Sequence, residues 1–203
     1  MISFRDRALH EAGHLVGAFE AVLTLQLPIT YIDQIWISTL YENEEEPHGT
    51  MLGQFSWWAP MKPNVPCRDL SQSRAMYQIA LSCLTGPAAT WKLYGRNEAT
   101  KMLTLADEEE AFDCLTSAVA YLTMSDPPTT ERLSNLPPAF LPLYLEHLIK
   151  STFEKTCRRA VQLVEHRWNV VVAVTDAVLA TETKNDRKSL SRRPLLKLLM
   201  DNW

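Results

Sequence analysis

Apolar residues recur every three or four positions over the first 25 residues of the chain. They would form one face of a helix: Leu9, Ala12, Val16, Phe19 and Leu23. This spacing is typical of an amphipathic helix, because positions three and four apart lie on the same side of a 3.6-residue turn. We therefore predict a helix over residues 2–25, which Pro28 closes.

A different pattern follows, in runs rich in β-branched and aromatic residues. The runs are QIWIST at 34–39 and TMLGQFSW at 50–57, separated by the acidic, turn-rich ENEEEPHG. This arrangement predicts a β-hairpin or a small sheet. The segment WAPMKPNVP at 58–66 contains three prolines and is expected to be a connector.

Helical spacing returns at Asp69 and is expected to meet a kink or a new helix start at Gly86-Pro87. A further helix is predicted to open with the acidic run at 107–110, whose charges suit a helix N-terminus. The proline-rich stretch at 125–140 then interrupts the pattern.

Three more helices are predicted after this interruption, at residues 145–168, 170–181 and 194–200, the last with Ser191 as a possible N-cap. The expected fold is therefore mainly α-helical, with a small β-hairpin or sheet beside the first helix. We divide the chain into a core, residues 1–125, and a C-terminal helical subdomain, residues 126–203.

Composition narrows the classes of function. The chain has 203 residues, 46% of them hydrophobic, which is typical of a globular protein. Its net charge of −4 argues against nucleic-acid binding, which needs a basic surface. The four cysteines form no C-x-x-C pair, so we interpret them as small core residues in a reducing compartment. Neither a signal peptide nor an 18-residue apolar run is evident, so a cytoplasmic or organelle-stroma location without a membrane span is expected.

The pentapeptide HEAGH at 10–14 is the strongest chemical signal. His10 and His14 lie about one turn apart on the predicted helix, so both imidazoles can reach one ion. Glu11 is rotated about 100° from His10, which suits a base acting on a water at that ion better than a third ligand. The alternative is a pair of helix-surface histidines beside a solvated glutamate.

A catalytic zinc site needs a third protein ligand and an open position. The sequence offers Glu20, His48, the glutamates within residues 42–46, and the acidic run at 107–110. Glu20 has the spacing of the third ligand of a long metzincin motif, but that geometry requires a turn at Gly17, where the helical pattern continues. The glutamates within residues 42–46 are also typical of a solvated turn without a metal. The acidic run at 107–110 is also typical of a helix N-terminus, where negative charges are favourable.

Several segments together resemble the peptidase domain of the FtsH family of AAA-linked zinc proteases. RALHEAGHLVGAF resembles the family's AYHEAGHA helix, and IDQIWIS with GTMLGQF resembles its KVTI and LGYT strands. QIALSCLTGPAATWKLYG is similar to LLGGRAAEELVFG, and LADEEEAFDCLTSAVAYLTMSD to the segment that carries N-D-L and a spaced alanine, matched here by Ala111. VQLVEHRWNVVVAVTDAVLATET and LSRRPLLKLL resemble the closing helices.

The resemblance implies zinc held by His10, His14 and Asp107, with Glu11 as general base. It also implies a polypeptide substrate. Two departures are visible: Thr90-Trp91 stand where the family has paired glutamates, and Asp107 lies in an A-D-E context. No G-x-x-x-x-G-K-[ST] motif of an ATPase is present, so the resemblance by itself does not imply the family's coupling to ATP or its hexameric ring.

We therefore predict a zinc-dependent endopeptidase that cuts unfolded or exposed polypeptide without ATP. A strand of the 34–57 region would hold the substrate by edge pairing. The alternative is a non-catalytic module of the same fold that binds a partner, such as a separate AAA ATPase or a second copy of the chain. A plain helical scaffold without metal is the third interpretation.

Overall fold

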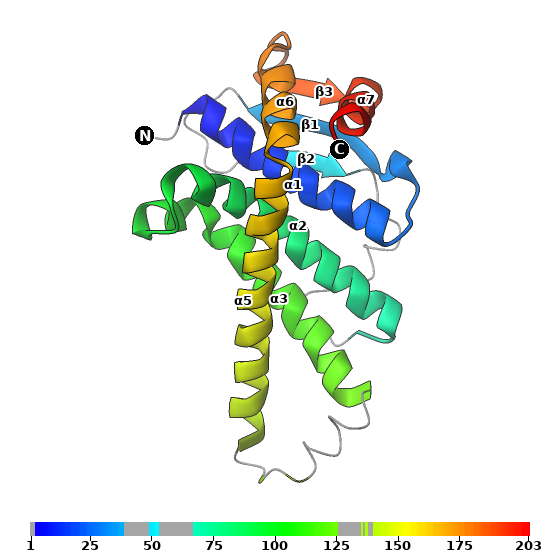
Figure 1. The fold of residues 1–203 in the computed structure, drawn as a ribbon, viewed down its shortest axis with the longest axis vertical. Coiled ribbons are helices and arrows are strands. Elements are labelled where there is room, and N and C mark those ends of the chain that lie inside the picture. Colours follow the sequence, from blue (N-terminus) through cyan, green and yellow to red (C-terminus); the bar gives the residue numbers. More distant parts are fainter. Residues whose placement is uncertain (1–2, 39–48, 53–66, 126–134, 136, 138–139) are drawn as a thin grey trace.

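The computed structural model describes residues 3–38, 49–52, 67–125, 135, 137 and 140–203. Within them, helices predominate and a small antiparallel sheet accompanies them (Figure 1). The predicted fold class, mainly α with a small β element, is thus confirmed. The helices are α1 (Phe4–Thr24), α2 (Leu70–Tyr94), α3 (Glu98–Ser125), α5 (Leu141–His166), α6 (Trp168–Leu179) and α7 (Arg192–Asn202).

Helix α1 confirms the first predicted helix, and its start has a clear local cause. Ser3 is the N-cap: its hydroxyl accepts a hydrogen bond from the Asp6 amide, while the Asp6 carboxylate accepts one from the Ser3 amide. This capping box satisfies two backbone N–H groups that have no partner inside the helix. The helix continues unbroken past Gly17, so the metzincin-like turn does not occur there.

Helices α1 and α2 approach each other closely because glycines line their contact. A Cβ atom added to Gly13 would lie 2.5 Å from the Thr85 carbonyl oxygen, and one added to Gly17 would lie 2.3 Å from the Thr85 hydroxyl oxygen. Only glycine leaves room for this contact between backbones. Helix α2 also packs against α3, so it links the two helices that carry the candidate metal ligands.

Helix α2 corrects the prediction of a kink or new start at Gly86-Pro87. The helix runs continuously from Leu70 to Tyr94 with Pro87 inside it. Proline removes one backbone hydrogen bond, but every residue from Leu84 to Trp91 is buried between neighbouring elements. Tertiary packing therefore holds this turn despite the missing hydrogen bond.

Helix α3 corrects a second prediction, because it begins at Glu98 and not at the acidic run. Its start has a local signal: the Thr100 amide donates to the Asn97 side chain at 3.1 Å, and the Asn97 amide donates to the Thr100 hydroxyl at 3.0 Å. Residues 98–106 are also good helix formers without glycine or proline. Asp107 therefore lies well inside the helix.

The sheet has the strand order β2-β1-β3 and is antiparallel throughout. Strands β1 (Ile32–Ser38) and β2 (Gly49–Leu52) confirm the predicted pairing, and residues 53–57 of the second predicted strand lie outside the described residues. Strand β3 (Arg187–Ser191) was not predicted. Its sequence RKSLS contains no β-branched or aromatic residue, so only pairing with β1 identifies it.

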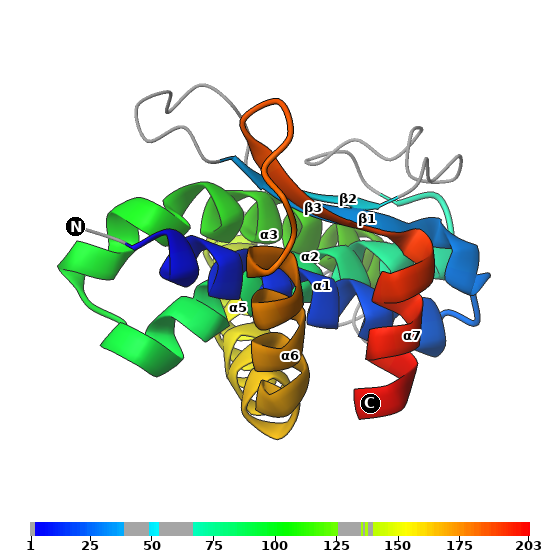
Figure 2. The ribbon, with the colours of Figure 1, turned by 90° about the horizontal axis from the view of Figure 1, so that it is seen from above.

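The sheet lies on one side of α1, and α5 and α6 lie on the other (Figure 2). Strand β1 is buried at every residue from Ile35 to Ser38, and Ile35 and Ile37 are fully buried in the core. Helix α6 packs against α1, and Arg5 binds Asp176 at 2.7 Å between these two helices. The C-terminal segment thus joins the first helix and the sheet, while the division at residue 125 stays a prediction.

The remaining helices broadly match the predicted ranges, with one local difference. Ser191 precedes α7 with an extended backbone, as an N-cap does, but its side chain makes no capping hydrogen bond. A short 3-10 helix, η1 (Ile29–Tyr31), connects α1 to β1. None of the helices in the described part of the chain combines the length and the apolar character needed to cross a bilayer.

Candidate metal centre

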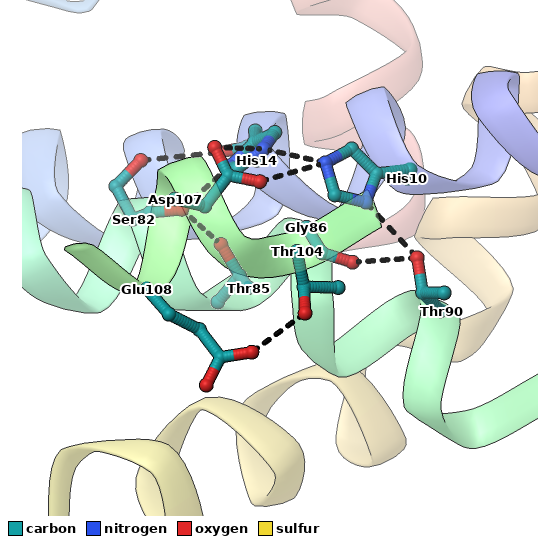
Figure 3. Close-up of polar contacts among 9 residues, drawn as sticks. All are labelled: His10, His14, Ser82, Thr85, Gly86, Thr90, Thr104, Asp107 and Glu108. Carbon is teal, nitrogen blue, oxygen red and sulfur yellow. Dashed lines mark hydrogen bonds and ion pairs between the residues drawn. The ribbon is translucent and has the colours of Figure 1, made fainter. Parts of the chain in front are cut away.

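His10, His14 and Asp107 meet where α1 and α3 approach each other above α2 (Figure 3). The Nε2 atoms of the two histidines are 3.0 Å apart. Asp107 Oδ2 lies 3.0 Å from His10 Nε2, and Asp107 Oδ1 lies 3.5 Å from His14 Nε2. The cluster therefore combines two histidines one helical turn apart with Asp107, which lies 97 positions after His10 in the chain.

These separations suit a tetrahedral metal ion. Zinc is bound by histidine nitrogen and carboxylate oxygen at about 2.0–2.2 Å, which places neighbouring donors roughly 3.3 Å apart. The observed distances of 3.0, 3.0 and 3.5 Å bracket that value. The cluster could therefore hold a metal ion with three protein ligands. Its side chains are 16–25% exposed, so the cluster is partly accessible to water.

The other nitrogen of each histidine ring is bound to α2. His10 Nδ1 lies 2.9 Å from the Thr90 hydroxyl oxygen, and His14 Nδ1 lies 2.9 Å from the Ser82 carbonyl oxygen. A carbonyl oxygen only accepts hydrogen bonds, so His14 carries its proton on Nδ1. The Thr90 hydroxyl donates toward the Gly86 carbonyl oxygen at 3.4 Å and accepts from His10. When both rings are neutral, their Nε2 lone pairs are thereby directed at the shared position.

Gly86 creates the space for His14 beneath the cluster. A Cβ atom at this position would lie 2.2 Å from His14 Nε2 and 2.5 Å from Cε1. Any larger side chain would therefore displace the imidazole. Ser82, Gly86 and Thr90 follow one another at four-residue intervals, so one face of α2 supports the whole cluster.

The electrostatics of the cluster favour a cation at its centre. Burial opposes a charge on His14, but the hydrogen bond and charge of Asp107 outweigh it and raise the pKa of His14 to about 9. Burial likewise opposes the charge of Asp107, yet the bonds to His10 and His14 hold the pKa of its carboxyl far below the usual value. A proton or a metal cation can satisfy the three donor groups.

Glu11 lies next to this cluster but is not one of its three members. Its side chain is buried, with 6% of the residue exposed, and its carboxylate contributes to raising the pKa of His14. Its negative charge therefore favours a cation on His14.

The structure separates Asp107 from the other acidic candidates. Glu20 faces α5, where Arg159 lies 3.8 Å from its carboxylate. Glu108 points away from the histidines (Figure 3) and accepts hydrogen bonds from Thr104 at 2.6 Å and Arg96 at 2.9 Å. Glu109 and Glu110 are exposed. His48 and residues 42–46 lie outside the described residues.

The cysteines keep their protons. Burial raises the pKa of Cys114 and Cys157 to about 12 and also raises the pKa of Cys67 and Cys83. A thiolate is the form that binds metals or attacks substrates. The described part of the chain places none of these thiols in the metal cluster.

Sequence reasoning identified the three cluster residues but not the groups that orient them. It treated Gly86 as a helix breaker and Thr90 only as a departure from a family pattern. The available signal was the four-residue spacing of Ser82, Gly86 and Thr90 on a predicted helix. That spacing acquires meaning only once α2 is known to lie against the HEAGH helix.

Comparison with the models of known protein families gives no match to this sequence, and comparison with curated proteins gives none either. The candidate metal centre therefore stands on its geometry and its donor chemistry. The three donors define a group that could hold a metal ion.

Proposed function

We propose that this protein is a zinc-dependent endopeptidase that resembles the FtsH-type peptidases and hydrolyses unfolded or exposed polypeptide without ATP. The observation that carries the proposal is the arrangement of His10, His14 and Asp107 with both histidine Nδ1 atoms bound to α2. Two nitrogens and one carboxylate oxygen form a donor set that zinc accepts in catalytic sites. Glu11 beside them supplies a candidate base.

Bound zinc would polarise the scissile carbonyl and lower the pKa of a water molecule. Glu11 would accept a proton from the attacking water and deliver it to the leaving amine. The water oxygen forms the new bond to the carbonyl carbon as Glu11 takes the proton, and the C–N bond breaks when the leaving nitrogen receives that proton. One proton of the water is then on the amine product and the other stays with the acid product. Asp107 and the two histidines keep their orientation throughout, because α2 and α3 hold them.

The expected substrate is a polypeptide segment in an extended conformation. Strand β2 lies at one edge of the described sheet, and β3 lies at the other. An extended segment can add to such an edge through backbone hydrogen bonds, with little demand on its sequence. When no ATPase is present to unfold substrates, the isolated chain should cut casein-like proteins and spare tightly folded ones.

The decisive experiment replaces Glu11 by glutamine. Glu11→Gln should retain about one zinc per chain and lose proteolysis of casein, because the base is removed and the ligands stay. Glu165→Gln, an exposed change on α5, is the matched control and should cleave like the wild-type protein. The proposal fails if the zinc-loaded wild type cuts no unfolded protein, or if Glu11→Gln cuts as well as wild type.

A second candidate is a non-catalytic module in which metal joins α1 to α3 and the surface binds a partner, such as a separate AAA ATPase or a second copy of the chain. The burial of Glu11 favours this alternative, because a catalytic base has to reach the substrate. Under this alternative, zinc binds and stabilises the fold, yet casein stays intact with wild type and Glu11→Gln alike. The same two measurements therefore separate the two functions.

A further inference from the structure

A groove with a volume of about 790 Å³ lies between the N-terminal part of α2 and the C-terminal part of α3. Its wall on α3 is apolar and includes Leu115 and Leu122, and its wall on α2 includes Leu70 and Tyr77. The hydroxyl of Ser73 donates to the carbonyl oxygen of Ala118 at 3.3 Å and joins the two helices at the groove. This volume and lining fall in the range of small-ligand sites.

The groove contains a buried amide group without a partner. Gln78 is 7% exposed and lines the groove. Within the described residues its Oε1 atom is buried and accepts no hydrogen bond. Leaving such a group unpaired is unfavourable, and buried amides are normally satisfied. A turn of the side-chain amide would present this acceptor to the groove, where a ligand with a hydrogen-bond donor would satisfy it.

The groove also carries a positive charge without a counter-ion. Arg74 precedes Gln78 by one helical turn on the same face of α2 and is exposed. None of the described residues forms an ion pair with Arg74, and no acidic side chain lines the described part of the groove. The protein as a whole has a net charge of −4, so this local positive charge stands out. An anionic group is its natural complement.

We propose that this groove binds the C-terminal residue of a peptide. Its free carboxylate would bind Arg74, and its apolar side chain would pack against Leu115 and Leu122. Its backbone N–H would donate to Gln78 Oε1 once the amide has turned toward the groove. Arg74 and Gln78 rise about 6 Å apart on one face of α2, and the long arginine side chain spans that separation. One residue with a free carboxylate supplies all three features at once.

Calorimetric titration of the chelator-treated protein with acetyl-Ala-Ala-Leu, as the free acid and as the C-terminal amide, tests this site. The acid should bind and the amide should bind at least about tenfold more weakly, because the charge-assisted bond to Arg74 is lost. Metal-free protein is used so that binding at the groove is independent of the peptidase proposal. Equal binding of acid and amide, or no binding of either, overturns the inference.

Two substitutions complete the test. Arg74→Gln should weaken binding of the acid about tenfold and Gln78→Leu about fivefold, while Arg158→Gln, an exposed change on α5, should leave it unchanged. Gln78→Leu should also raise the melting temperature of the free protein, since it removes an unpaired buried amide, so weaker binding cannot be attributed to unfolding. Unchanged affinity in Arg74→Gln or in Gln78→Leu overturns the inference.

Discussion

The hydroxyl of Thr90 lies 2.9 Å from Nδ1 of His10, on the side of the ring opposite the candidate metal position. Removal of this acceptor should free the ring to rotate and to exchange tautomers, because the Thr90 hydroxyl fixes the position and the proton of Nδ1. Thr90→Val, which keeps the shape, should therefore lower zinc affinity about tenfold, the scale attached to losses of this kind. Competition with a fluorescent zinc chelator measures the change.

Thr90→Ser is the matched control for this prediction. It keeps a hydroxyl at the same position and should bind zinc nearly as wild type. If Thr90→Val also binds zinc as tightly as wild type, the hydroxyl does not orient His10.

We expect Asp107 to be the third zinc ligand, so its replacement should weaken zinc binding and replacement of the other acidic residues should not. Asp107→Asn should lower zinc affinity by at least about tenfold, because the charged oxygen donor is lost. Glu20→Gln and Glu108→Gln should leave zinc content nearly unchanged, since Glu20 faces Arg159 and Glu108 is bound by Thr104 and Arg96. Zinc content is measured after dialysis against limiting metal. Loss with Glu20→Gln and retention with Asp107→Asn would assign the third ligand to Glu20.

Gly86 gives a steric prediction. In Gly86→Ala the new methyl group would lie 2.2 Å from His14 Nε2, so His14 must leave the cluster and zinc binding should be lost. Gly17→Ala is the comparison: it also overpacks the contact of α1 and α2, at a cost of about 1–3 kcal/mol, but its methyl would meet Thr85 and Ser82. Denaturation and zinc titration of both variants distinguish the effects. Tight zinc binding by Gly86→Ala would show that His14 is not required.

The His14–Asp107 contact predicts how the metal-free protein responds to pH. The pKa of His14 rises from 6.5 in the unfolded chain to about 9 in the fold, so its stabilising effect is complete below pH 6.5 and disappears as the pH rises through 9. The pKa of Asp107 is lowered from 3.8, so its contribution is present above pH 3.8 and is lost as the pH falls further. Urea denaturation with a chelator present should show lower stability at pH 9.5 than at pH 6.

Asp107→Asn should reduce the loss of stability that the metal-free protein shows as the pH rises, because the charge that raises the pKa of His14 is gone. Zinc should show the opposite trend to the metal-free stability. Its affinity should increase with pH up to about 9, since the metal must displace the proton on His14. A steep loss of stability between pH 6.5 and 9 in Asp107→Asn would assign the effect to another group.

Local patterns were sufficient to predict most helices and the pair of histidines in HEAGH, because both depend on residues close in the sequence. The spacing of His10 and His14 is fixed by helix geometry alone. Asp107 is different: nothing local distinguishes it from Glu108, and its selection depends on how α3 crosses α1. The resemblance to a peptidase family indicated Asp107, and the fold places it beside the two histidines.

The errors have the same origin. The acidic run at 107–110 is a good helix start by charge, yet Asn97 and Thr100 already form one at an earlier position. Strand β3 is defined by its neighbour and not by its own composition. Thr90 and Gly86 matter because of the histidines above them, so their roles appear only when tertiary contacts are known.

The pairing of β1 with β3 has a consequence for how the protein is made. Gln34 pairs with Ser191, more than 150 residues later in the chain. Contacts of such long range close late and slow the folding of a domain. On the ribosome, α1, α2 and α3 are complete long before β3 leaves the exit tunnel, so the histidines and Asp107 can meet while one edge of β1 is still unpaired. Until synthesis ends, that open edge is the part of the nascent chain most in need of protection from aggregation.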